Sequence, residues 1–173
     1  YYRIGDAGKL VDPDDPAKGV LFDGRLAEDF KLTSGSWVAV GALRIEVIGA
    51  ASPVIQDAVI TGADRDWVGL LAWPNLAACR DLAGAAEDLP VEELCVSPAV
   101  NRQLLEGLRT YNATHRGSST RVARVMLMRE PPQIDANEVT DKGYINQRAV
   151  LERRKALVDR LYTPTPDSEV LVL

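Results

Sequence analysis

The chain has 173 residues, of which 46% are hydrophobic, and this is enough for one domain with a real core. Its formal net charge of −5 argues against binding to nucleic acid or to a membrane surface, because both anionic partners require a basic face. No apolar run approaches the roughly 20 residues that a transmembrane helix needs, and no secretory leader is visible. We therefore expect a soluble protein.

The two cysteines, Cys79 and Cys95, have no metal-ligand spacing and no histidine near them. We predict that both are buried thiols rather than ligands or a disulfide, which is typical of a cytoplasmic protein. The only histidine, His115, is expected at the end of a helix. With one histidine and no Gly-x-Ser-x-Gly motif, neither a histidine-based triad nor a zinc site is expected.

The first 60 residues predict mostly short strands. Three β-like runs alternate with turn residues, at positions 1–4, 8–11 and 20–22. Asp23-Gly24 is typical of a turn, and Ser34-Gly35 marks a second flexible point. A strand over residues 31–40 and a short helix over residues 42–51, stopped by Pro53, complete this part.

The next segments predict a hairpin and then helices. Residues 54–60 and 67–73 are rich in β-branched and aromatic residues, and the turn residues between them predict that they pair. Because both runs are almost entirely apolar, helices should cover at least one face of their sheet. Asn75 can cap a helix to about residue 86, and Ser97-Pro98 opens another to residue 113, with Ser97 as the cap.

The last third predicts a strand over residues 121–128, a loop over residues 137–143 and a helix over residues 146–162. Residues 163–173 are expected to form a loose tail. The predicted fold class is therefore α+β, with a small central β-sheet flanked by helices, preceded by a short β segment that belongs to another body.

Three motifs stand in a fixed order along the chain. The first is Tyr2-Arg3-Ile4-Gly5-Asp6, and the second begins at Gly24-Arg25 and continues through charged residues to Lys31 and Gly35. The third is Thr140-Asp141-Lys142-Gly143-Tyr144-Ile145-Asn146-Gln147-Arg148. Two glycines that flank a short charged strand suit a hinge, although an ordinary hairpin turn with solvated charges would have the same composition.

Together these motifs resemble those of the acyl-adenylate-forming enzymes, which include acyl-CoA and aryl-CoA ligases, peptide-synthetase adenylation domains and luciferase. The wording of the second and third motifs is most similar to the feruloyl-CoA synthetase branch. The resemblance implies a C-terminal domain of the family, with its fold. The chain opens inside the first motif, so we expect it to be the C-terminal third or so of a longer synthetase.

The resemblance also implies roles for individual residues. Asp6 and Arg25 would contact the ribose or phosphate of the nucleotide, and Lys142 would be the catalytic lysine of adenylate formation. The family places its lysine after the glycine, so a strict alignment brings Tyr144 to that position, two residues after Lys142. Either Lys142 reaches the site from there or the lysine role is absent. Without the resemblance, Asp6 and Arg25 would be assigned to turn hydrogen bonds or a surface ion pair.

Four further residues follow from position. Ala27 occupies the pivot of the hinge, where the family usually has Asp or Lys. Lys31, Gly35 and Trp37 lie in the segment that the family turns toward the pantetheine arm of coenzyme A. For Trp37 a core position, and for Lys31 a solvated strand position, are the alternatives.

The implied division is residues 1–26 as the end of the large adenylation domain with the start of the hinge, 27–162 as the mobile C-terminal domain, and 163–173 as the tail. The implied function is part of an ATP-dependent acid–CoA ligase that converts ferulate, ATP and CoA to feruloyl-CoA, AMP and diphosphate. Its partners would be its own large domain, an aromatic acid and coenzyme A, with Mg²⁺ arriving with ATP and not bound here. The alternative is a non-catalytic regulatory or interaction module derived from such a domain.

Overall fold

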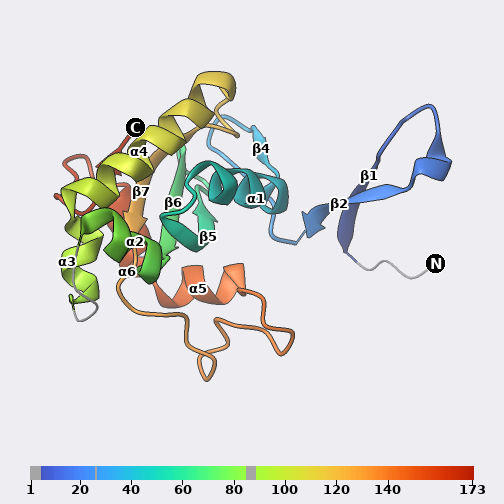
Figure 1. Cartoon of the computed structure of the whole chain (residues 1–173). Helices are drawn as coiled ribbons and strands as arrows, with labels where there is room; N and C mark the ends of the chain where they lie inside the picture. The colour runs from blue at the N-terminus through green and yellow to red at the C-terminus, as the bar shows by residue number, and fades with distance from the viewer. Residues whose placement is uncertain (1–4, 26, 85–88) are drawn as a thin grey trace.

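The structure is a computed structural model that describes residues 5–25, 27–84 and 89–173. It has the expected α+β architecture, a four-stranded sheet flanked by helices, preceded by two small β-ribbons. In Figure 1 the first ribbon extends beyond helix α1, away from the central sheet. Every helix of the described ranges is too short or too polar to cross a bilayer.

The first ribbon consists of β1 (Asp6–Leu10) and β2 (Val20–Arg25), paired antiparallel across a loop that contains the 3-10 turn η1 (Pro16–Lys18). The strands predicted at residues 8–11 and 20–22 are therefore confirmed, whereas the run at 1–4 lies outside the described residues. The predicted turn at Asp23-Gly24 is wrong, because β2 continues through both residues. The register of the pair shifts between Asp6 and Gly8, so Asp23-Gly24 on the other strand forms a bulge within β2.

The second ribbon replaces the single strand that was predicted over residues 31–40. β3 (Phe30–Lys31) pairs antiparallel with β4 (Trp37–Val38), and α1 (Val40–Ala50) begins directly after them. The chain reverses at Gly35, whose φ of 82° lies in the left-handed region and whose N–H donates to the carbonyl of Leu32 at 2.8 Å. The flexible point at Ser34-Gly35 is therefore confirmed as a turn.

The central sheet has the strand order β5-β6-β7-β8. The predicted hairpin is confirmed as β5 (Ile55–Thr61) antiparallel to β6 (Val68–Pro74), and β7 (Val122–Leu127) lies parallel to β6. The loose tail is wrong, because β8 (Leu171–Val172) adds to β7 and Val170 is buried. Backbone hydrogen bonding to β7, a pairing remote in sequence, decides the conformation of this end.

The parallel connection from β6 to β7 passes through three helices, α2 (Leu76–Ala83), α3 (Val91–Val96) and α4 (Pro98–Thr114). Asn75 caps α2 as predicted, but the helix ends at Ala83 because Gly84 adopts a left-handed conformation; the rest of the prediction, at residues 85 and 86, lies outside the described residues. α4 begins at Pro98 as predicted, although the Ser97 side chain makes no capping hydrogen bond. α3 was not predicted.

Two helices follow β7 instead of the single helix predicted over residues 146–162. α5 (Gln147–Arg153) and α6 (Lys155–Leu161) are separated at Arg154, whose side chain is drawn into a buried ion pair. His115 follows the last residue of α4 as expected, and Cys79 and Cys95 are confirmed as buried free thiols.

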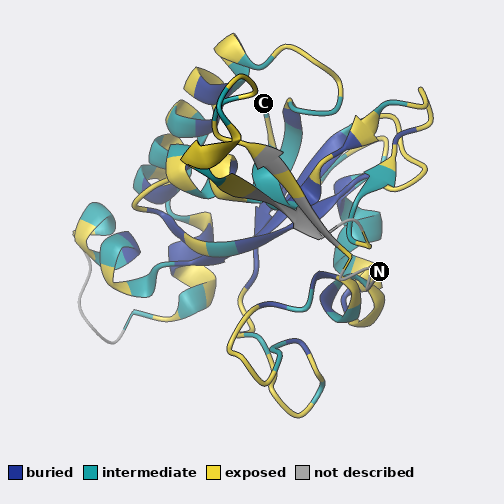
Figure 2. Cartoon of the chain, turned by 90° about the vertical axis from the view of Figure 1, so that its right-hand side faces the viewer, coloured by how far each residue is buried: buried dark blue, intermediate teal, exposed yellow. Residues whose placement is uncertain are grey.

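Alternate residues of the central strands enter two separate cores. On one face, Ala58, Ile60, Leu70 and Ala72 pack with α1 to α4, and on the other, Val59 and Leu71 pack with α5 and α6. Helices therefore cover both faces, as the apolar strands indicated, and Figure 2 shows the central strands as the most continuously buried part of the chain.

Candidate functional site

Asp6 and Arg25, the two candidate nucleotide ligands, are directly opposite each other in the first ribbon. The backbone register pairs them as the last partners of β1 and β2, next to the bulge. The backbone thus brings together two residues that are 19 positions apart in the sequence, at the end of the ribbon nearest the hinge.

The candidate pivot, Ala27, is exposed and lies two residues after Arg25, the last residue of β2. Two residues later, the Asp29 side chain accepts a hydrogen bond of 2.9 Å from the N–H of Val40, the first residue of α1. This carboxylate thus satisfies a backbone N–H at the start of α1, which the methyl side chain of Ala39, the residue before the helix, cannot do. The compact body is therefore anchored from Asp29 onward, and Ala27 lies just outside that anchor.

Lys31, Gly35 and Trp37 come together in the second ribbon. Lys31 and Trp37 are cross-strand partners, and the Lys31 ammonium lies 5.0 Å from the centre of the Trp37 ring, within the range of a cation–π contact. Trp37 is 62% exposed, so the core alternative for this residue is wrong. A Cβ on Gly35 would meet nothing within 4 Å. The three residues form an open surface with one broad aromatic face.

Lys142 lies at the tip of a short hairpin. Val139 and Ile145 form an antiparallel bridge, and Thr140 N–H donates to the carbonyl of Tyr144 at 2.8 Å. Gly143, with φ of 80°, completes the three-residue loop, because this loop type requires a left-handed residue before the returning strand. Lys142 is exposed, and its ammonium makes no ion pair with the described residues.

The Lys142 hairpin and the Trp37 ribbon lie at opposite ends of the central sheet (Figure 1). The ribbon is hydrogen-bonded to the β5–β6 turn, because the Thr33 N–H donates to the carbonyl of Arg65 and the Asp64 N–H donates to the carbonyl of Lys31. The hairpin lies at the other end, where Gly143 and Ile145 line a cavity of about 490 Å³ with Gln56 and Pro74. Since each strand between them has seven residues at about 3.3 Å each, the separation is on the order of 20 Å.

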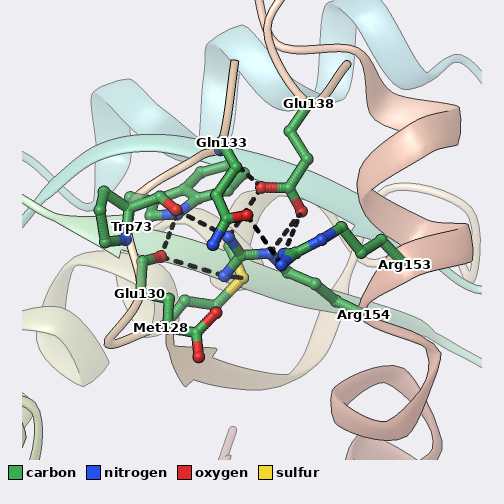
Figure 3. A network of polar contacts seen from close by, with 8 residues as sticks. Trp73, Met128, Glu130, Gln133, Glu138, Arg153 and Arg154 are labelled. Carbon is green, nitrogen blue, oxygen red and sulfur yellow. Dashed lines mark hydrogen bonds and ion pairs between the residues drawn. The ribbon is translucent and has the colours of Figure 1, made fainter. Parts of the chain in front are cut away.

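A buried ion pair holds the base of the Lys142 hairpin (Figure 3). Glu138 is fully buried and Arg154 is 6% exposed. The Arg154 Nε and Nη2 atoms each donate to a Glu138 carboxylate oxygen at 2.8 Å, a two-point geometry that fits guanidinium to carboxylate. The Arg154 hydrogen bonds, with smaller contributions from the Gln133 N–H and Arg153, lower the pKa of Glu138 to about 2. Glu138 is therefore ionised at neutral pH.

Arg154 and Gln147 are buried polar residues to which the sequence analysis gave no role. Both lie on the apolar stripe that contains Val150 and Leu161, because Gln147 is three residues before Val150, and Arg154 is four residues after Val150 and seven before Leu161. A polar residue on an otherwise apolar stripe was the available signal. Gln147 uses this position to pair with both the N–H and the carbonyl of Ile60, at 3.1 and 2.6 Å.

The protein-family model described as "AMP-binding enzyme C-terminal domain" matches residues 40–165 of this chain. A curated relative, "Probable acyl-activating enzyme 16, chloroplastic" from Arabidopsis thaliana, is 26% identical over 174 residues, covering 94% of this chain and 23% of the relative. The chain thus spans about a quarter of that protein.

Solved structures share the fold at lower identity. The A domain of a carboxylic acid reductase from Segniliparus rugosus, solved with AMP and a co-purified carboxylic acid, has a TM-score of 0.66 at 19% identity and covers 92% of this chain and 23% of that one. The adenylation domain of a carboxylate reductase from Mycobacterium chelonae has a TM-score of 0.66 at 18% identity, and the match covers 93% of this chain and 23% of that one. The anthranilate CoA ligase AuaEII, solved with anthranoyl-AMP, has a TM-score of 0.52 at 19% identity, and the match covers 88% of this chain and 23% of that one.

The family match covers most of the compact body, from the first residue of α1 to the residues just after α6, and the sheet with helices on both faces recurs in these adenylating structures. The chain belongs to the C-terminal domain family of the AMP-binding, adenylate-forming enzymes.

Proposed function

We propose that this chain is the mobile C-terminal domain of an ATP-dependent acid–CoA ligase, with ferulate or a related hydroxycinnamate as the acid. The observation that carries the proposal is that Lys142 and the Lys31–Trp37 ribbon lie at opposite ends of one sheet. The exposed Ala27 comes just before this compact body in the chain. A rotation of the body about Ala27 would bring first the Lys142 end and then the Lys31–Trp37 end of the sheet to an active site on the large domain.

In the first half-reaction the acid carboxylate attacks the α-phosphate of ATP, giving acyl-AMP and diphosphate. Negative charge gathers between the carboxylate oxygen and the α-phosphate, and a compact ammonium placed there stabilises the transition state. Lys142 supplies that charge in this proposal. Asp6 would hold the ribose hydroxyls and Arg25 the ribose or phosphate oxygens, from the paired end of the first ribbon.

In the second half-reaction the CoA thiol attacks the acyl carbonyl and AMP leaves. The Lys31–Trp37 ribbon would line the approach of the pantetheine arm, because Trp37 offers a broad exposed aromatic face and Gly35 allows close approach of a ligand. Mg²⁺ would enter with ATP and be held by groups outside this chain.

The domain division follows the same proposal. Residues 1–26 would close the large domain, the mobile body would begin at residue 27, and it would include β8, so residues 163–173 are assigned to the body rather than to a tail. The buried free thiols of Cys79 and Cys95 favour a reducing compartment such as the cytoplasm.

One observation favours the second candidate, a non-catalytic regulatory or interaction module. The aligned lysine position is occupied by Tyr144, which is 66% exposed and carries no positive charge at neutral pH. If Lys142 does not reach the nucleotide from two residues earlier, the hairpin is a structural cover.

The deciding experiment compares Lys142→Ala with Tyr144→Phe in the full-length protein that contains this chain. Adenylate formation, followed by exchange of labelled diphosphate into ATP, should fall about 10²-fold to 10³-fold in Lys142→Ala. Thioester formation from preformed acyl-AMP should remain, and Tyr144→Phe should change neither step. An unchanged adenylation rate in Lys142→Ala would favour the module.

The rotation is tested by Ala27→Pro, which fixes φ and removes an N–H donor at the proposed pivot. One orientation should then be trapped, so one half-reaction survives much better than the other. An equal loss of both half-reactions, or no loss, would place the pivot elsewhere. The 173-residue chain alone should form no acyl-CoA.

A further inference from the structure

The segment between β7 and α5, residues 128–146, is long but is tied down at several points. Its first part is held where Arg154 donates to the carbonyls of Glu130 and Pro131, at 3.0 and 2.9 Å. Its middle is held at Glu138, whose carboxylate accepts hydrogen bonds of 2.8 Å from the same guanidinium and from the Gln133 N–H. One side chain therefore closes the excursion from residue 130 to residue 138 into a ring (Figure 3).

The clamp passes directly into the hairpin. Asn146 N–H donates to the Glu138 carbonyl at 2.9 Å, one step before the Val139–Ile145 bridge, so the residue that meets Arg154 is also the base of the hairpin. Lys142 is only four residues from Glu138. The place where Arg154 holds that carboxylate therefore helps to set the backbone position of Lys142, together with the packing of Val139 and Ile145 in the core.

Arg154 is itself held against the sheet. Its guanidinium lies 5.3 Å from the centre of the Trp73 ring, and the Trp73 indole N–H donates to the carbonyl of Glu130 at 2.9 Å. Trp73 belongs to β6. The chain of contacts therefore runs from the central sheet through Arg154 and Glu138 to the base of the Lys142 hairpin.

A buried ion pair is a poor device for stability alone, because the cost of removing both charges from water offsets much of their attraction. Its geometry, however, is well defined, since a guanidinium and a carboxylate fit in a planar two-point contact. Within the part of the chain that the structure describes, the hydrogen bonds of the hairpin tip, residues 140–144, join the tip only to itself. The Glu138–Arg154 ion pair is therefore better suited to fixing the position of the Lys142 hairpin than to adding stability.

We propose that Glu138 and Arg154 are positioning residues, which hold the Lys142 hairpin in the pose that adenylate formation requires. This inference rests on the proposed role of Lys142. It differs from a general structural role, because the pair should matter for the half-reaction that uses the hairpin and not for the one that uses the opposite end of the sheet.

The kinetic test uses Glu138→Gln in the full-length protein. This change keeps the size of the side chain and removes the charge. A displacement of about 1 Å can cost about 10²-fold in rate, so adenylation should fall by between 10-fold and 100-fold while thioester formation from preformed acyl-AMP stays within twofold. Glu152→Gln, a surface glutamate paired with Arg148, is the matched control and should change neither step.

A double variant separates positioning from stability. If Glu138 acts through Lys142, then Glu138→Gln should lower adenylation no further in a Lys142→Ala background. Additive losses, or equal losses in both half-reactions, would overturn the proposal. Should Glu138→Gln not fold, Arg153→Gln replaces it, because Arg153 is exposed and donates to both Glu138 and Gln133.

A second readout does not depend on catalysis. Amide hydrogen exchange of the 173-residue chain should accelerate at least 10-fold at Thr140, Gly143 and Asn146 in Glu138→Gln, with little change at Ile60 in β5. Unchanged exchange in the hairpin would overturn the positioning role whatever the enzyme does. A wild-type full-length protein that forms no adenylate would instead refute the proposed function, and the exchange result would still stand as evidence on the clamp.

Discussion

Replacement of Gly107 by alanine tests the packing of the two longest helices against each other. Gly107 lies inside α4, where its Cα faces the end of α1. A Cβ there would lie 3.1 Å from the carbonyl carbon of Ala50 and 3.5 Å from the Cα of Ala51, and it would overlap the Ala50 carbonyl oxygen. These are backbone atoms, so no side-chain rotation can relieve the contact.

Two effects oppose each other in Gly107→Ala. Alanine is better than glycine in a helix interior by about 1 kcal/mol. Overpacking a well-filled core costs about 1–3 kcal/mol, and here α4 must move away from α1, which loosens the contacts of the fully buried Leu104 and Leu108. Because the overlap is with a backbone oxygen, the steric cost should lie in the upper part of that range, about 2–3 kcal/mol, and the free energy of unfolding should fall by about 1–2 kcal/mol.

The assay is urea unfolding followed by far-UV circular dichroism. With a slope of about 2 kcal/mol per M, the midpoint for Gly107→Ala should fall by roughly 0.5–1 M at an unchanged slope. Gly49→Ala is the control, because Gly49 lies in α1 and a Cβ there meets nothing within 4 Å. That variant should gain about 0.5–1 kcal/mol. A Gly107→Ala protein as stable as the wild type would refute the packing argument.

Three further predictions concern buried polar groups and thiols. Gln147→Leu leaves the N–H and carbonyl of Ile60 unpaired beside a buried side chain, so the free energy of unfolding measured in urea should fall by about 2–3 kcal/mol, and a loss below 0.5 kcal/mol would mean that water replaces the amide. The pKa of Glu138 is lowered from 4.5 to about 2, so its contribution to stability is complete above pH 4.5 and is lost as the pH falls toward 2. An acid titration of unfolding should show a smaller loss between pH 5 and pH 3 in Glu138→Gln, and equal losses would contradict this assignment. Burial raises the pKa of Cys79 and Cys95 to about 11, so a thiol-specific reagent at pH 8 should label the folded chain far more slowly than the urea-unfolded chain, and similar rates would contradict their burial.

Much of the fold could be predicted because it depends on local patterns. The β5–β6 hairpin followed from two apolar runs separated by turn residues, and the start of α4 followed from Pro98 after Ser97. The candidate residues Lys31 and Trp37 could be named from the motif, but their mutual contact depends on the turn at Gly35, which splits what was predicted as one strand.

The amino-acid sequence by itself determined the family, the α+β class and the positions along the chain of β5, β6, β7 and the main helices, because turn residues and hydrophobic periodicity act over a few neighbouring positions. Only the tertiary structure decided three other features: the bulge in place of a turn at Asp23-Gly24, the addition of β8 to the sheet, and the break at Arg154. Each of these depends on partners remote in sequence. Neighbouring strands supply backbone hydrogen bonds to β2 and to β8, and at the break Arg154 pairs with the buried carboxylate of Glu138, 16 positions earlier in the sequence.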